Sequence, residues 1–305
     1  MLKGHQPTIS ESGGWASQRN LLTRARAGRI RIVVTYLASQ EPWHDEPVGR
    51  GPSSHGGGQH ASGPEQSGTA LSLTGVQYRD HPSDALAAAG VSLQVPPGQT
   101  VALFSRPAAE AAALLDVIAG LRRPGSGQVL VDGIAVHRLR GAALDRYRRH
   151  RGLLSTRFPL LPSLSVVNNV LAAAPSRRAE ASIRNRAGEL LELTGTQHLA
   201  AKLAGALAAE QQWRVLIARA LLASPGLVLA EDPSPGLELG NAIVILDLLI
   251  DIQARFGFTL LLATGSLATA SGCERVVRLG GGRVAADDLA SGDDEWTRGR
   301  IDRIG

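Results

Sequence analysis

Two stretches of the chain carry residues whose types and spacing bear on phosphate chemistry. The first, VALFSRPAAEAAALL (101–115), reads as an apolar strand, a turn and an apolar helix. Such a unit cradles phosphate when its turn supplies glycines, a lysine and a hydroxyl, because the free N–H groups at a helix start face the anion. The matching positions here hold Ser105, Glu110, Ala111 and Ala112. The sequence therefore predicts the geometry of a phosphate loop without its binding groups.

The second stretch, LVLAED (227–232), has the apolar pattern of a buried strand and ends in Glu231 and Asp232. Carboxylates at the end of a strand can hold Mg²⁺ or serve as a general base. The alternative is a pair of solvated acids with no chemical role. Both readings stay open at this point.

The bulk composition indicates a globular protein of one large or two small domains. The chain has 305 residues, 44% hydrophobic and 19% charged, with a formal charge of +5. A single cysteine, Cys273, excludes an internal disulfide and a cysteine zinc cluster. The basic residues are nearly all arginine, since Lys3 and Lys202 are the only lysines. No apolar run reaches the roughly 18 to 20 residues that span a bilayer.

Composition and hydrophobic pattern divide the chain into three parts. Residues 1–68 form a low-complexity, basic extension that contains GRGPSSHGGGQHASGPEQSG and cannot bury enough apolar surface to fold. Its RNLLTRARAGRIRIVVTYL segment could be an arm for anionic surfaces or plain unstructured chain. Residues 69–290 have the texture of a compact α/β domain, and 291–305 form a short polar tail.

Alternating apolar strands and helices predict a parallel sheet wrapped by helices. The strands are expected at 71–78, within 91–105, at 128–136, 227–232 and 259–265, with a terminal hairpin at 273–287. The helices are expected at 110–121, ending at Gly120, and at 177–193, 210–223 and 241–257.

Read in order, four blocks resemble the ATP-binding subunit of an ABC transporter, over nearly all of residues 70–290. VALFSRPAAEAAALLDVIAGLRRPGSGQVLVDG is similar to its phosphate loop, helix and following strand, and FPLLPSLSVVNNV to the segment after its Q-loop. LAAEQQWRVLIARALLASPGLVLAEDPSPGLE resembles its signature helix, Walker B strand and D-loop, and LLATGSLATASGCERVVRLGGGRV its switch loop and final hairpin. The residues of these blocks are most similar to those of lipoprotein-release and macrolide exporters.

The resemblance implies an α/β, P-loop NTPase-like fold. Its mostly parallel sheet would be flanked by helices, with an N-terminal antiparallel β subdomain and a helical signature subdomain. It also assigns the two glycines, the lysine and the hydroxyl of the phosphate loop to positions 105, 110, 111 and 112. At each of these positions, this chain has a different residue from the one that the family uses. Glu110 would place a carboxylate where the phosphate sits, and two unit charges about 4 Å apart repel by ~4 kcal/mol at an effective dielectric of 20. Its alternative role is structural, because an acid in a first helical turn complements the helix dipole and would fill the anion site from within.

The other nucleotide-contacting positions also depart. The Q-loop glutamine falls on Thr156, a weak ligand or an ordinary loop residue. The signature pattern falls on 207–211, where alanine replaces the serine, Glu210 replaces a glycine and Gln211 is kept. The switch histidine falls on Gly265.

In the Walker B strand, the resemblance gives Glu231 the magnesium position and Asp232 the general-base position. The two acids are exchanged relative to the family, so each side chain misses its usual length by one methylene. Because an ångström can cost about a hundredfold in rate, an efficient base is not expected. The aromatic that stacks on adenine falls on Asp80, with Tyr78 at the inner position, unless the register slips by one residue. The D-loop ends in Glu238 where aspartate is usual.

Three functions follow from these residues. The favoured one is a degenerate ABC subunit that does not bind or hydrolyse ATP efficiently, and is the structural or regulatory partner of a membrane permease or of a competent ATPase subunit. It would lie in the cytoplasm, at the inner face of the membrane through the permease, as a homo- or heterodimer. The alternative is an active ATPase, for which ATP and Mg²⁺ would be the cofactors. A binder of nucleic acid or anionic surfaces through YRRHR (147–151) is disfavoured, because no aromatic residues interleave the arginines.

Overall fold

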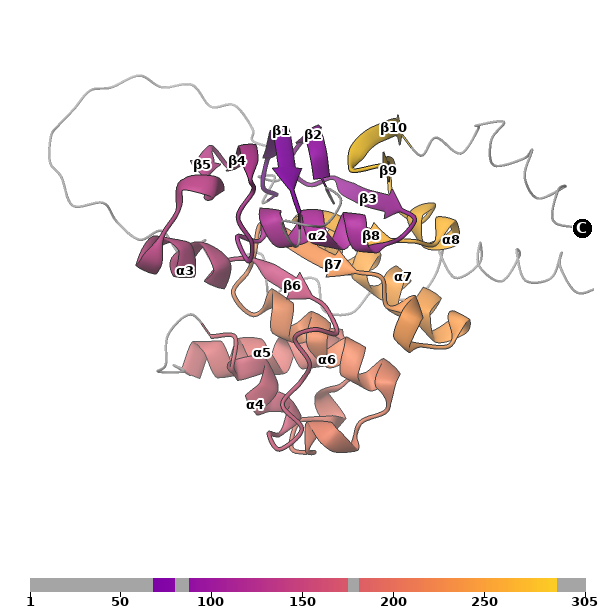
Figure 1. Cartoon of the computed structure of the whole chain (residues 1–305). Helices are drawn as coiled ribbons and strands as arrows, with labels where there is room; N and C mark the ends of the chain where they lie inside the picture. Colours follow the sequence, from indigo (N-terminus) through magenta and orange to yellow (C-terminus); the bar gives the residue numbers. More distant parts are fainter. Residues whose placement is uncertain (1–67, 80–87, 175–180, 290–305) are drawn as a thin grey trace, which may run out of the picture. The chain divides into compact units, whose positions relative to one another are not determined.

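The computed structural model describes residues 68–79, 88–174 and 181–289, shown as ribbons in Figure 1. The expected extension 1–68 (apart from its last residue), the tail 291–305 and the Asp80 position lie outside these ranges. Their boundaries and roles therefore stay predictions.

A small antiparallel sheet packs above the main one in the view of Figure 1. Its strands follow the order β2 (Ala88–Val95), β1 (Leu71–Tyr78), β4 (Ser126–Val131) and β5 (Ile134–Ala135). All its pairs are antiparallel. Leu71, Leu73 and Val76 are buried, which places the apolar side of β1 against the core. The expected antiparallel β subdomain is confirmed.

The main sheet has six strands. Their order is β10 (Arg283–Leu289), β9 (Arg275–Gly280), β3 (Thr100–Ser105), β8 (Thr259–Thr264), β7 (Leu227–Glu231) and β6 (Gly152–Leu154). β9 to β6 pair in parallel, and β10 is an antiparallel edge strand. All six residues of β8 are buried, as expected for a strand covered on both faces. The carboxyl ends of β3, β8, β7 and β6 share one edge of this sheet, which brings together the residues that follow them.

The helices lie on both faces of this sheet. They are α2 (Ala109–Ile118), α3 (Gly141–Arg149), α4 (Val166–Leu171), α5 (Ala181–Leu193), α6 (Ala209–Leu221), α7 (Leu239–Phe256) and α8 (Leu267–Ala270). As predicted, the chain leaves α2 at Gly120, whose φ of 68° suits a residue without Cβ. The basic stretch before β6 forms α3. Neither α3 nor β6 was predicted from the sequence, because their apolar patterns are short. None of the helices in the described ranges combines the length and hydropathy that a membrane span needs.

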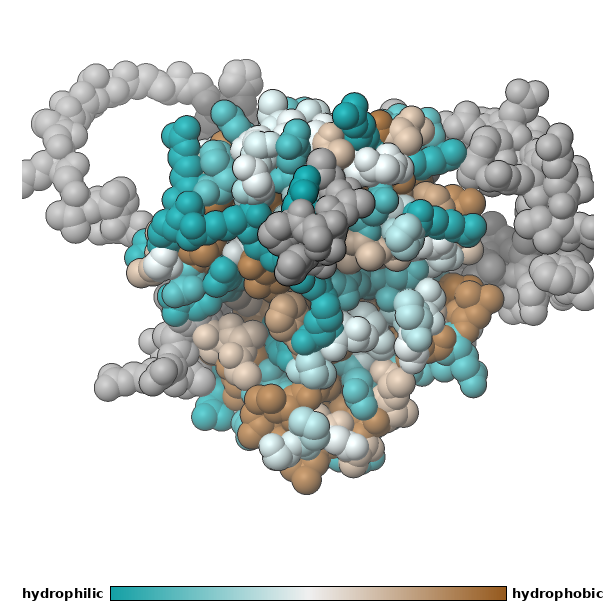
Figure 2. All heavy atoms as spheres, viewed as in Figure 1, coloured by the Kyte–Doolittle hydropathy of each residue, from teal (hydrophilic) through white to brown (hydrophobic). Residues whose placement is uncertain are grey.

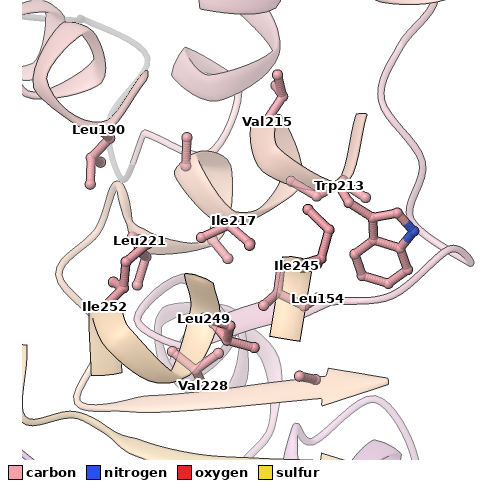
Figure 3. Packing of buried hydrophobic residues seen from close by; sticks show 14 of the residues in the cluster. Leu154, Leu190, Trp213, Val215, Ile217, Leu221, Val228, Ile245, Leu249 and Ile252 are labelled. Carbon is pink, nitrogen blue, oxygen red and sulfur yellow. The ribbon is translucent and has the colours of Figure 1, made fainter. Parts of the chain in front are cut away.

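Two apolar cores hold the layers together. One lies between the small sheet, α2 and one face of the main sheet. The other covers the opposite face, where α4, α5, α6 and α7 pack. Figure 3 shows Ile217 of α6 close to Ile245 and Leu249 of α7 in this second core, with Val228 of β7 beneath. The fold is thus the expected α/β class, with α4 to α6 forming the helical subdomain.

Candidate functional site

The segment 105–112, called the 105–112 loop below, runs from the last residue of β3 into the first turn of α2. It is closed by the side chain of its first residue, Ser105. Ser105 is fully buried; its hydroxyl accepts from the Ala111 N–H (3.1 Å) and donates to the Pro107 carbonyl (2.8 Å). The N–H of Ala112 donates to the Ala108 carbonyl at 3.1 Å. Amides at a helix start usually need an anion, a cap or water. Here the Ala111 amide is satisfied from within by a residue at a glycine position.

Glu110 lies in the first turn of α2 but turns towards another element. Its carboxylate accepts from the N–H of Gly282, in the β9–β10 turn, at 3.3 Å. Its own backbone N–H donates to the Pro107 carbonyl at 3.4 Å. The expectation that Glu110 fills the anion site from within is therefore wrong, because the group on the loop amide is the Ser105 hydroxyl. The expected place of Glu110 in the first helical turn is confirmed.

The turn after β8 lies directly against this loop. A Cβ on Gly265 would meet the Ala108 Cβ at 3.3 Å and the Ser105 carbonyl oxygen at 3.5 Å. The Nε of Arg106 donates to the Gly265 carbonyl at 3.2 Å. Gly265 thus lies next to the 105–112 loop, and a Cβ there would require Ala108 to give by a few tenths of an ångström. Its assignment to the switch position stays a prediction.

Glu231, at the end of β7, has both carboxylate oxygens engaged. Its Oε2 accepts from the Ser155 hydroxyl at 2.6 Å. Its Oε1 accepts from Nε (2.9 Å) and Nη2 (2.5 Å) of Arg157. Ser155 and Arg157 flank Thr156 just after β6, and Thr156 itself is exposed. The position assigned to magnesium is therefore contacted by a guanidinium, and the residues that contact Glu231 here are the two neighbours of Thr156.

Arg157 also binds a buried acid on α2. Its Nη1 and Nη2 contact the two oxygens of Asp116 at 2.8 and 2.7 Å, and the Asp116 side chain is 5% exposed. Arg122 adds a second ion pair, with Nε 3.3 Å from Asp116 Oδ2. The hydrogen bonds that Arg157 donates to Asp116, with the nearby Glu231 charge, raise the pKa of the Arg157 guanidinium above its ordinary value. The fixed positive charges of Arg157 and Arg122 together therefore balance the two acids.

Asp232, at the general-base position, is part of the turn that follows β7. Its Oδ1 accepts from the Ser234 N–H at 2.8 Å, and its Oδ2 from the hydroxyl of the buried Thr264. The same hydroxyl accepts from the Ser266 N–H at 2.9 Å. Asp232 thus joins the ends of β7 and β8 through hydrogen bonds and is not a freely solvated acid.

The signature positions lie at the start of α6, remote in sequence from the loop. The Gln211 side chain accepts from the Ala208 N–H at 3.1 Å, which caps the helix. Glu210 pairs with Arg214 one turn later, at 2.8 Å. Both contacts serve the helix itself. Tyr78, the inner aromatic, is buried in β1 with its hydroxyl accepting from Arg122, so it has no face free to stack on a base.

The carboxylates in this arrangement do not fit a magnesium ion held by Glu231 and Asp232. Each of their four oxygens accepts a hydrogen bond from a protein donor. The cavity beside Glu231, lined also by Asp116 and Arg157, has a volume of about 10 Å³, enough for one water at most.

The sequence did not single out Asp116, Ser155 and Arg157 around Glu231, nor Thr264 beside Asp232. Asp116 was the one recognisable signal, because an acid within the apolar run AAALLDVIAG needs a partner when it is buried. One of its partners, Arg122, lies in the turn after the helix, whereas the other, Arg157, lies 41 residues away and has no local pattern.

Comparison with known proteins places these observations in a family. The family profile described as ABC transporter matches residues 88–235. The phosphonates import ATP-binding protein PhnC of Rhizobium etli is 37% identical over 216 residues, which cover 68% of this chain and 77% of that protein. The lipoprotein-releasing system ATP-binding protein LolD of Syntrophotalea carbinolica is 34% identical over 196 residues, 64% of this chain and 86% of that protein.

The same family emerges from solved structures. The dimeric ATP-binding cassette MJ0796, in a post-hydrolysis state bound to ADP and Pi, superposes with a TM-score of 0.64. It is 26% identical, and the match covers 73% of this chain and all of that one. The relatives thus include the lipoprotein-releasing type expected from the sequence and, at higher identity, import proteins. Fold, collinear motifs and these identities together show that the chain belongs to the ABC transporter family of ATP-binding subunits.

Proposed function

We propose that this chain is a degenerate ABC subunit, which supports a membrane permease or a competent ATPase subunit without binding or hydrolysing ATP efficiently. The observation that carries the proposal is the hydrogen bond from the Ala111 N–H to the Ser105 hydroxyl. It uses, inside the protein, a helix-start amide that would otherwise be offered to a phosphate.

The charges around the loop support the same conclusion. The position of the phosphate-binding lysine is Ala111, and Lys202 belongs to the helical subdomain. Arg157 is already balanced by two carboxylates, and Arg106 is engaged with Gly265. A triphosphate bound here would have to displace these contacts and bring its own charge close to Glu110, Glu231 and Asp232.

A partner role is supported by the surface that remains. Phe158 and Leu161 of the segment after β6 are 40% and 52% exposed, and Leu203 is 54% exposed. Leu203 forms a β-bridge with Ser165, so these residues belong to neighbouring segments. Figure 2 shows hydrophobic residues gathering at the end of the molecule where the helical subdomain lies. Association with a permease at the inner face of the membrane, as a homo- or heterodimer with another cassette, fits this surface.

An active ATPase is the second candidate, and the names of the relatives favour it. PhnC and MetN relatives are called import ATP-binding proteins, at 37% and 35% identity. Under this reading, the 105–112 loop would open on meeting Mg-ATP, and Arg106 would supply the missing positive charge.

Calorimetric titration of the full chain with Mg-ATP separates the two candidates. We expect no saturable heat at nucleotide concentrations up to about 1 mM, and hydrolysis equal to the buffer background. A dissociation constant below about 100 μM would instead establish the ATP-binding reading. The Arg106→Ala variant is the matched control, because it abolishes binding under the second candidate and changes nothing under the first.

A further inference from the structure

One guanidinium connects two acids that come from different elements. Asp116 projects from α2 and Glu231 ends β7, and the same nitrogen, Arg157 Nη2, lies 2.7 Å from the first and 2.5 Å from the second. The remaining donors of Arg157 complete a two-nitrogen contact with each carboxylate. This bridging geometry depends on the flat fork of arginine, which a point charge cannot reproduce.

The residue that carries this charge belongs to a loop, residues 155–165, that is fastened at further points. The Ser155 hydroxyl accepts from the Arg157 N–H at 3.1 Å while donating to Glu231. Arg219 of α6 donates to the carbonyls of Phe158 and Pro159.

Its far half is held by Asn169 of α4. The Asn169 side chain accepts from the Leu161 N–H (2.7 Å) and donates to the Leu161 carbonyl (3.0 Å). The 155–165 loop therefore connects the sheet edge to the helical subdomain. Arg157 attaches it to α2 and, together with Ser155, to β7 of the sheet.

We propose that Arg157 is a resident cation: it takes the place of a divalent metal ion between Asp116 and Glu231, and it holds the 155–165 loop in one position without any ligand. The proposal goes beyond the function proposed above. It concerns the acid pair and the loop, and it stands or falls independently of whether ATP reaches the 105–112 loop.

Two consequences separate this role from that of an ordinary surface ion pair. Without Arg157, the loop loses its attachment to α2 and keeps only the Ser155 hydrogen bond to Glu231 of β7, so its backbone opens more often. The vacated position is then lined by the carboxylates of Asp116 and Glu231 and by the Ser155 hydroxyl, the hard oxygen donors that bind divalent cations. Asp116 keeps its ion pair with Arg122, which leaves its second oxygen for the ion.

Hydrogen–deuterium exchange on the full chain tests the first consequence. In Arg157→Ala, the amides of Phe158, Leu161 and Leu164 should exchange at least about tenfold faster than in the unmodified chain. Arg275→Ala is the matched control, because Arg275 of β9 makes a two-nitrogen ion pair of similar geometry with Asp287 of β10, and its removal should leave those amides unchanged. Glu231→Gln leaves the ion pair of Arg157 with Asp116 in place, so it should give a smaller increase in the exchange rate of these amides. It provides the test if Arg157→Ala does not fold. Unchanged exchange in Glu231→Gln and in a folded Arg157→Ala would overturn the loop attachment.

Binding of Mn²⁺ tests the second consequence. It is measured as the loss of the electron paramagnetic resonance signal of free Mn²⁺. The unmodified chain should bind no Mn²⁺ at about 0.1 mM, Arg157→Ala should bind one ion, and Arg157→Ala/Glu231→Gln should lose it. Binding by the unmodified chain that Glu231→Gln abolishes would show that a metal ion and not Arg157 occupies the position. Absence of binding by Arg157→Ala would equally overturn the metal-like role.

Discussion

The hydroxyl of Ser105 lies 3.1 Å from the backbone nitrogen of Ala111 and accepts its hydrogen bond. It spans the mouth of the 105–112 loop, from the end of β3 to the start of α2. The loop is therefore closed by more than the absence of a lysine. Restoring the missing phosphate ligands alone leaves this bond in place.

This closure predicts which substitutions restore nucleotide binding. Glu110→Gly/Ala111→Lys/Ala112→Ser supplies the ligands but keeps Ser105, whereas adding Ser105→Gly also frees the Ala111-position amide. A hydrogen bond to a charged group contributes about 1.5 to 3 kcal/mol, so the fourfold variant should bind Mg-ATP at least about tenfold more tightly than the threefold one in calorimetry. Equal affinities would show that the Ser105 hydroxyl does not compete with phosphate.

A second prediction concerns the buried Asn169. Its side chain bonds Leu161 twice and the carbonyls of Leu164 and Ser165 once each. Asn169→Ala leaves these backbone groups unpaired and should lower the free energy of unfolding by about 2 to 3 kcal/mol, measured by urea denaturation. The neighbour Asn168 is exposed, so Asn168→Ala is the control and should cost under about 0.5 kcal/mol. A similar loss in both variants would mean that helix propensity, and not the buried amide, governs the effect.

The longer strands and helices and the identity of the family could be predicted, because they rest on apolar periodicity and on blocks of residues in a fixed order. The sheet edge that collects Ser105, Glu231 and Asp232 follows from a parallel sheet alone. The partner of each side chain could not be predicted. Glu110 could equally have capped its own helix from within, and only the packing of the β9–β10 turn shows that it bonds Gly282.

The contacts of Arg157 with Asp116 and Glu231 show even more clearly that the partners of a side chain could not be predicted. A sequence pattern relates residues a few positions apart, whereas Arg157 is 41 residues from Asp116 and 74 from Glu231. Thr156, to which the resemblance assigned the Q-loop position, is exposed, and the contacts with Glu231 come from the residues on either side of it. Short elements such as β6 and α3 were missed because three to nine residues give too few turns or alternations to establish a period.

Thr264 gives a third prediction, since its buried hydroxyl lies between Asp232 and Ser266. Thr264→Val keeps the shape but leaves the Asp232 carboxylate and the Ser266 N–H each without a partner from this residue. The free energy of unfolding should fall by about 1 to 3 kcal/mol in thermal or urea denaturation. Thr269→Val is the control, because the Thr269 hydroxyl takes no part in these bonds and its replacement should leave the stability nearly unchanged.

The last prediction is a pH dependence that comes from Cys273. Burial of the thiol, helped by the charge of Glu274, raises its pKa to about 12. The unfolded chain releases this proton near the ordinary thiol pKa of about 8.5, so above that pH the unfolded state binds fewer protons and stability falls. Between about pH 9 and pH 10 the chain should lose roughly 1 kcal/mol more unfolding free energy than Cys273→Ala in urea denaturation. Parallel pH profiles for the two proteins would mean that Cys273 ionises as readily in the folded chain as in the unfolded one.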